Sequence, residues 1–186
     1  MMHRYLFPEP LAYDGGQLAP LWIFHRLGLT GDAIVAFRGG CSVDLASLVD
    51  QADVRAGSPI FSEDMLHFLV EHFENDLEKA VLRQRFLVVS IAEELAGRGC
   101  ALRRSGDDLF LDQRKLSVSI ATITPVSVVI HTGVNIHPGA APVPAAGLAD
   151  LGLARDWAAI AEAVMRAYAR EMEGVHLARC KVRGVG

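Results

Sequence analysis

Residues 105–120 hold the side chains of this chain that are best placed to do chemistry. They read as a β-hairpin, because apolar and polar residues alternate along two short strands. The polar face would carry one acid, one lysine and two hydroxyls: Asp108, Lys115, Ser117 and Ser119. A lysine above small hydroxyl side chains can bind a carboxylate or a phosphate. The hairpin therefore predicts a site for a small anion, with Lys115 at its centre.

The register of this hairpin depends on its turn. If Gln113-Arg114 is the turn, Asp112 lies opposite Lys115 and Asp108 lies opposite Ser119. Neither turn residue favours the positive φ that a two-residue hairpin turn needs. An exposed ion pair on an uncovered sheet face, worth about 0–1 kcal/mol, is the alternative, and the pattern by itself favours it.

The stretch 126–136 extends the polar face. Its alternation places Ile130, Thr132, Val134 and Ile136 on one side, and it places His131, Gly133, Asn135 and His137 on the other. A glycine inside a strand marks a place where something comes close, either a ligand or another backbone. We expect Gly133 and Asn135 to help shape the site around Lys115.

A second cluster of functional groups lies in residues 62–74. Ser62 followed by two carboxylates is a good helix start, and the apolar residues that follow recur at helical spacing. On a helix over 63–74, Asp64, His67 and Glu71 share one face and could bind a divalent metal or move protons. The alternative is a solvated helix face, which the lack of an HExxH or paired-cysteine motif favours.

The elements that must position these groups predict an α+β fold, with a mixed or antiparallel sheet packed by helices. Asn75 and Glu78 resemble a capping box, which starts a second helix at 76. The expected strands are 32–37, 101–104, 108–112, 115–123 and 126–136. The expected helices are 63–74, 76–96 and 155–173, and the prolines of 137–144 predict a loop.

Composition limits the class of protein. The chain has 186 residues, enough for one well-buried core, and we expect a single domain over 1–186. A net charge of −4 gives no support for binding nucleic acid or an anionic membrane. No apolar run reaches the roughly 18 residues of a membrane span, and the first residues do not form a secretory signal. Three widely spaced cysteines, Cys41, Cys100 and Cys180, predict reduced thiols in the cytoplasm.

The hairpin resembles that of the biotin protein ligases. Residues 107–116, Asp-Asp-Leu-Phe-Leu-Asp-Gln-Arg-Lys-Leu, are similar to their Trp-Pro-Asn-Asp-Leu, short spacer, Lys-Leu-x-Gly pattern. Residues 128–136 are similar to the following strand, Val-Ile-Gly-x-Gly-Ile-Asn-Val. The resemblance implies the catalytic fold of biotin and lipoate ligases. It also implies that Lys115 contacts the carboxylate and the adenylate phosphate, with ATP and Mg²⁺ as cofactors.

The departures from that pattern keep two functions open. Val118 stands where the ligases have glycine, and Arg38-Gly39-Gly40 is the nearest counterpart of their arginine- and glycine-rich adenylate loop, which makes Arg38 a candidate phosphate partner. We expect an enzyme that acts on a small carboxylic acid by acyl transfer or ATP-dependent ligation. The alternative is a binding module on the same fold that has lost chemistry.

End to end, the chain is identified as a member of the prokaryotic family known as domain of unknown function 366. The residues that carry this resemblance are 31–39, 62–68 and 115–122. The family implies a fold and no activity. The partners we expect are a small carboxylic acid or acyl group and, as an open alternative, a second copy of the chain.

Overall fold

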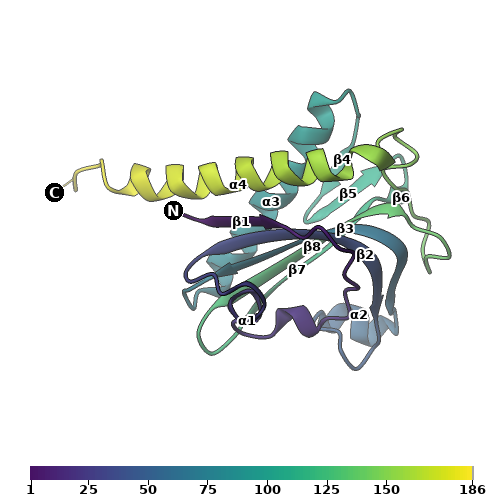
Figure 1. The fold of residues 1–186 in the computed structure, drawn as a ribbon, viewed down its shortest axis with the longest axis horizontal. Coiled ribbons are helices and arrows are strands. Elements are labelled where there is room, and N and C mark those ends of the chain that lie inside the picture. Colours follow the sequence, from purple (N-terminus) through teal and green to yellow (C-terminus); the bar gives the residue numbers. More distant parts are fainter. Residues whose placement is uncertain (186) are drawn as a thin grey trace.

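The computed structural model describes residues 1–185, which fold around a five-stranded sheet (Figure 1). Its strands lie in the order β1 (His3–Leu6), β2 (Ala33–Val43), β3 (Ile60–His72), β8 (Val128–His137) and β7 (Ser117–Ile123). β1 pairs with β2 in parallel, and the other three pairings are antiparallel. The predicted α+β class and mixed sheet are confirmed.

A small three-stranded sheet lies beside the large one. It consists of β4 (Arg103–Ser105), β5 (Asp108–Leu111) and β6 (Arg114–Lys115). The helices are α1 (Trp22–Leu27), α2 (Gln51–Ala56), α3 (Leu77–Gly97) and α4 (Trp157–Arg179), with short 3-10 turns η1 (Gly16–Leu18) and η2 (Ala154–Asp156). The predicted helices 76–96 and 155–173 match α3 and α4, although α4 runs six residues further.

The long helices α3 and α4 cover one face of the large sheet (Figure 1). Buried side chains recur along α3 at helical spacing: Ala80, Leu87, Val88, Ile91 and Leu95. α3 begins at Asp76, whose carboxylate accepts a hydrogen bond from Lys79 N at 2.9 Å. The expected capping box is therefore wrong by one residue, and Asn75 instead donates to Pro125 O.

The opposite face of the sheet is covered by the N-terminal segment, α1 and α2 (Figure 1). Tyr13, Ile23 and Phe37 pack there against Met65 and Leu69 of β3. Two apolar clusters thus enclose the central strands from both sides, and all of 65–72 is buried. Among residues 1–185, no helix is both long and apolar enough to cross a membrane.

The helix expected over 63–74 is wrong, because this segment is the central strand β3. A strand that is buried on both faces shows a continuous apolar run instead of alternation. In such a run the residues at helical spacing are apolar by coincidence. Tertiary packing between the two clusters therefore outweighed the helix-start signal at Ser62.

The turn of the β5–β6 hairpin lies one residue earlier than predicted. Asp112 and Gln113 form it, and Asp112 adopts a φ of 56°. Lys115 therefore lies opposite Phe110, so the pairing of Asp112 with Lys115 is wrong. The chain then leaves the small sheet, and Ser119 of β7 pairs with Thr132 of β8 instead of with Asp108.

Candidate functional site

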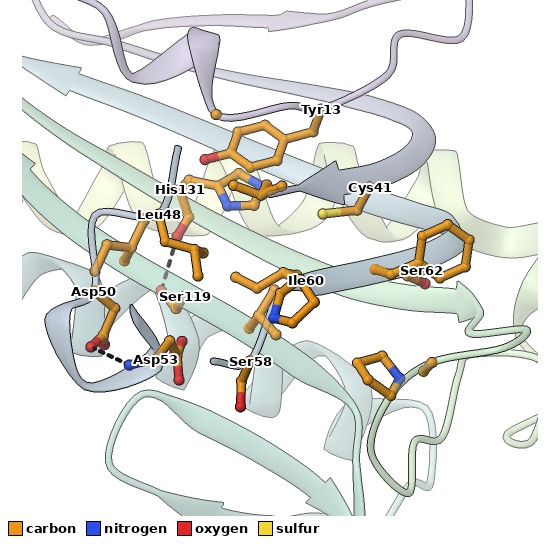
Figure 2. A pocket seen from close by; sticks show the side chains of 18 of the residues that line it. Tyr13, Cys41, Leu48, Asp50, Asp53, Ser58, Ile60, Ser62, Ser119 and His131 are labelled. Carbon is orange, nitrogen blue, oxygen red and sulfur yellow. Dashed lines mark hydrogen bonds between the residues drawn. The ribbon is translucent and has the colours of Figure 1, made fainter. Parts of the chain in front are cut away.

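A cavity of about 420 Å³ lies on the sheet face opposite α3 and α4 (Figure 2). The inner wall comes from β3, β7 and β8, and the β5–β6 hairpin closes one side. The segment around Tyr13, the α2 region and the loop 141–145 complete the lining. The cavity therefore collects residues from segments far apart in the sequence, as ligand sites commonly do.

Lys115 reaches this cavity from a strand whose backbone is bonded on both sides. Its N–H donates to Pro144 O at 2.9 Å, and its carbonyl oxygen accepts from Ala146 N at 3.0 Å. The side chain pairs with Asp108, with Nζ 3.0 Å from Oδ2. Both residues line the cavity and each is about one-third exposed. The sequence pattern paired Lys115 with Asp112, whereas in the structure Lys115 pairs with Asp108, in a different register of the hairpin.

Asp108 is a carboxyl group in a partly dehydrated, acidic place. Burial raises its pKa, the hydrogen bond from Lys115 opposes that rise, and the charges of Asp107 and Asp53 add to it. The cavity lining contains four aspartates and a single lysine: Asp50, Asp53, Asp107, Asp108 and Lys115. The cavity lining is thus acidic, which disfavours the binding of anions unless Lys115 or another cation pairs with them.

Asn135 supports the position of Lys115. Its Nδ2 donates to Lys115 O at 3.3 Å and to Ala146 O at 3.0 Å, and the residue lines the cavity. Ser119 also lines the cavity, but its hydroxyl is occupied by His131 O, Thr132 Oγ1 and Gln84 Nε2. Both residues therefore belong to the cavity wall and hold neighbouring groups in place, and their role toward a ligand stays a prediction.

Three other predicted site residues lie outside the cavity lining. The Ser117 hydroxyl is buried and accepts a hydrogen bond from Leu109 N at 2.9 Å. Gly133 is covered by Met65, whose Cε would lie 2.6 Å from an added Cβ. Arg38 points to the helix side, where it binds both carboxylate oxygens of Asp64. It is therefore not placed to meet a phosphate in this cavity.

The candidate metal cluster of Asp64, His67 and Glu71 is not formed, because these residues lie on the strand β3 instead of on one helix face. Asp64 is bound to Arg38, whereas His67 is buried beside His131. Glu71 accepts from Leu21 N at 2.9 Å and from the Ser127 hydroxyl at 2.7 Å. Within residues 1–185, no group of three or more His, Cys, Asp or Glu side chains is arranged to hold a metal ion.

One corner of the cavity, a pair of stacked aromatic rings, was not indicated as a site by the sequence pattern. The Tyr13 and His131 rings lie 3.6 Å apart and are nearly parallel (Figure 2). The alternation of β8 did place His131 on the same face as Asn135, so the sequence indicated that His131 could belong to the site. No such pattern indicated Tyr13, because it lies in an irregular segment. Cys41 also lines the cavity, and burial raises the pKa of its thiol to about 12.

Comparison with solved structures defines the class of fold. A biotin protein ligase from Aquifex aeolicus, in complex with biotin and ATP, is 13% identical with a TM-score of 0.59, covering 93% of this chain and 69% of that one. A Thermoplasma acidophilum protein assigned as a lipoate protein ligase, with bound lipoic acid, is 15% identical with a TM-score of 0.62, covering 93% and 86%. The fold is that of the biotin and lipoate ligase catalytic domains.

Within that fold class, the chain belongs to the family described as domain of unknown function (DUF366), whose model matches residues 2–183. An uncharacterized protein of Methanocaldococcus jannaschii is 38% identical over 173 residues, 90% of this chain and 78% of that protein. A Pyrococcus horikoshi protein of unknown function is 34% identical, with a TM-score of 0.94 over the whole of both chains. The cytoplasmic location, the lack of nucleic-acid binding and self-association stay predictions.

Proposed function

We propose that the protein is an enzyme that transfers a small acyl group, with Lys115 binding the acyl or carboxylate oxygen. The observation that carries this proposal is the Lys115 side chain on the cavity wall, whose backbone N–H and carbonyl oxygen are bonded to the 144–146 segment and whose ammonium pairs with Asp108. A fixed cation beside a reacting acyl carbon stabilises the negative charge that develops on its oxygen. The neighbours with bound lipoic acid and biotin support a carboxylic acid as the substrate class.

Asp108 would be the ion-pair partner of Lys115 when no ligand is bound. An incoming carboxylate or acyl oxygen competes with Asp108 for the ammonium, which has three donors. The raised pKa of Asp108 lets this carboxyl take up a proton when a second anion approaches. Asn135 and Ser119 would shape the wall around the acyl chain, while Ser117 and Gly133 act only by supporting their strands.

The lining does not fit ATP as a cofactor. Phosphates would face four aspartates with Lys115 as the lining's single cation, because Arg38 is bound to Asp64 on the other side of the sheet. Gly39 and Gly40 lie inside β2 and do not form a phosphate loop. We therefore favour acyl transfer from an already activated donor, such as a thioester, over ATP-dependent ligation.

In that reaction the acceptor's nucleophile attacks the thioester carbonyl, and Lys115 stabilises the tetrahedral oxyanion. The carbon–sulfur bond then breaks, and the thiol leaves with the proton of the nucleophile. Incubation with an octanoyl thioester and an amine acceptor tests this, with free thiol measured by a colorimetric reagent. Lys115→Met should lower thiol release by about 10²-fold or more. Lys181→Met, an exposed lysine near the C-terminus, is the matched control and should keep full activity.

A non-catalytic binding module is the second candidate. It is favoured by the buried Cys41 thiol, which is not an ionised nucleophile at neutral pH. Calorimetric titration with octanoate separates the two candidates. Binding that depends on Lys115 without any thiol release identifies the module. Unchanged octanoate binding by Lys115→Met would refute both roles for this lysine.

A further inference from the structure

His131, which lines the cavity, forms a buried imidazole pair with His67, and the hydrogen bonds of the pair determine the tautomers of both rings. His67 Nε2 lies 3.2 Å from the carbonyl oxygen of Gly39. A carbonyl oxygen can only accept, so His67 Nε2 carries a proton. Burial lowers the pKa of His67 to about 4, and the ring is therefore neutral near pH 7. Its Nδ1 is consequently an acceptor.

That acceptor determines the state of His131. His67 Nδ1 lies 3.0 Å from His131 Nε2, which must therefore donate. Burial, together with the neighbouring ring, holds the pKa of His131 well below its ordinary value, so its Nδ1 is unprotonated. Within residues 1–185 this nitrogen has no hydrogen-bond partner and is not fully enclosed. Because His131 lines the cavity, a lone pair is left for a ligand.

Tyr13 fixes the plane of the His131 ring. The two rings are stacked with an interplanar angle of 7° (Figure 2). Tyr13 is itself held by backbone hydrogen bonds to Gly40 and Ser42. Within the described residues, the Tyr13 hydroxyl has no hydrogen-bond partner either. The acceptor is thus presented in one orientation, which is the preorganisation that binding sites require.

A second polar group on the cavity wall also lacks a partner. The Ser62 side chain is 2% exposed, lines the cavity, and its Oγ makes no hydrogen bond within residues 1–185. Buried polar groups are rarely left unpaired, because an unpaired group loses its hydrogen bonds to water and gains none from the protein. A ligand that offered hydrogen bonds to these groups would remove that cost.

We propose that His131 Nδ1 is a specificity-determining acceptor, which selects ligands whose buried part carries an N–H or O–H donor over ligands with a plain hydrocarbon chain. Cyclic ureas, amides and alcohols belong to the favoured class. His67 is a positioning residue that holds the tautomer. The inference rests on the proposed function only for the carboxylate group of the ligand, which Lys115 would bind.

Imidazole nitrogen NMR tests the acceptor without any ligand. Long-range proton–nitrogen spectra of the labelled protein should show His131 Nδ1 as an unprotonated nitrogen and Nε2 as protonated at neutral pH. In His67→Leu the His131 signals should shift toward a mixture of the two tautomers, because Nε2 loses its acceptor. A protonated His131 Nδ1 in the unchanged protein would overturn the inference.

A matched pair of small rings tests the selection. 2-Imidazolidinone has two N–H donors, and its 1,3-dimethyl derivative has the same ring and carbonyl without them. The donor ring should bind at least about tenfold more tightly, as expected for one well-placed hydrogen bond in a dry site. It should also move the His131 Nδ1 resonance. Equal affinities, or no detectable binding of either ring, would overturn the selection.

Substitutions separate this inference from the proposed function. His131→Leu should abolish the preference for the donor ring, whereas His131→Asn should keep most of it, because the amide oxygen lies near the former Nδ1 position. Both variants should still bind octanoate through Lys115. Lys115→Met should show the reverse, with the ring preference intact and octanoate binding lost. A His131→Leu protein that keeps the ring preference refutes the acceptor role alone.

Discussion

A single added methyl group at Gly39 should destabilise the protein strongly. A Cβ at this position would lie 2.2 Å from the carbonyl oxygen of Leu11 and 2.7 Å from its carbon, both backbone atoms. The segment 11–13 would have to move away from β2, which would displace Tyr13 from His131. Overpacking of this kind costs about 1–3 kcal/mol, and contact with backbone places Gly39→Ala at the upper end. A chain of this length would then melt about 6–12 °C lower.

Gly40→Ala is the matched control. An added Cβ there meets its nearest atom, Glu63 O, at 3.3 Å, so a small adjustment suffices and the cost should stay below about 1 kcal/mol. Urea unfolding of both variants measures the difference, and the His131 nitrogen spectrum reports the loss of stacking. Equal stabilities would refute the close approach of segment 11–13. If either variant lost ATP binding while keeping full stability, the two glycines would instead act as a phosphate-binding loop.

Three further predictions concern charges and hydrogen bonds. Asp32→Asn should lower the free energy of unfolding by about 1–2 kcal/mol at neutral pH, because Asp32 accepts from His72 Nδ1 at 2.7 Å but is 43% exposed. Burial raises the pKa of Asp32, but the hydrogen bonds from His72 and from the Phe73 backbone outweigh it and lower this pKa below its ordinary value of 3.8. The stabilisation by Asp32 should therefore be present above about pH 4 and be lost as the pH falls further, which urea unfolding at several pH values would measure. Octanoate should bind more tightly as pH falls toward the raised pKa of Asp108, because protonation of this half-buried carboxyl frees Lys115. Calorimetry of Asp108→Asn should show tight binding without this pH dependence. Asn135→Asp should cost about 2–4 kcal/mol in urea unfolding, since a carboxylate would face two backbone carbonyl oxygens.

The fold was predictable where amphipathic periodicity was present. α3 and α4 have one buried and one exposed face, and both were placed from their spacing. β3 was not, because 65–72 is buried on both sides and a run without polar gaps gives no period. Its polar members, His67 and Glu71, looked like a solvated helix face. They are in fact buried and satisfied by partners that lie far away in the sequence.

The hairpin shows how one residue of register changes a site. The pattern placed Lys115 and Asp108 on one face correctly, because moving the turn by one residue shifts the pairing by two residues and leaves the faces of both strands unchanged. It failed at the turn itself, where Asp112 takes the positive φ that aspartate tolerates better than most residues. It also failed after Lys115, because no local signal shows that the chain passes from one sheet to another.

The site was predictable to the extent that strand alternation reaches it. The alternation of β8 put His131 and Asn135 on one face, and the resemblance to the ligase hairpin selected Lys115. Arg38 was misplaced because Arg-Gly-Gly reads as a flexible loop, whereas the absent side chain at Gly39 serves the approach of Leu11. Tyr13 reaches His131 only through tertiary packing, so its role could not be read from its neighbours in the sequence.

The surroundings of Lys115 and of His131 make different demands on a ligand, and together they would account for a ligase fold that serves another substrate. The cavity lining around Lys115 includes four aspartates, so we expect a single anionic group to bind only through this ammonium and a triphosphate to be disfavoured. The His131 ring is neutral and lies beside an aromatic ring, where it would offer a fixed acceptor. Folds are shared more widely than activities, because function depends on such local groups. If His131→Leu removed the preference for ligands with an N–H or O–H donor while octanoate binding stayed unchanged, His131 would set specificity while Lys115 alone set the need for an acid.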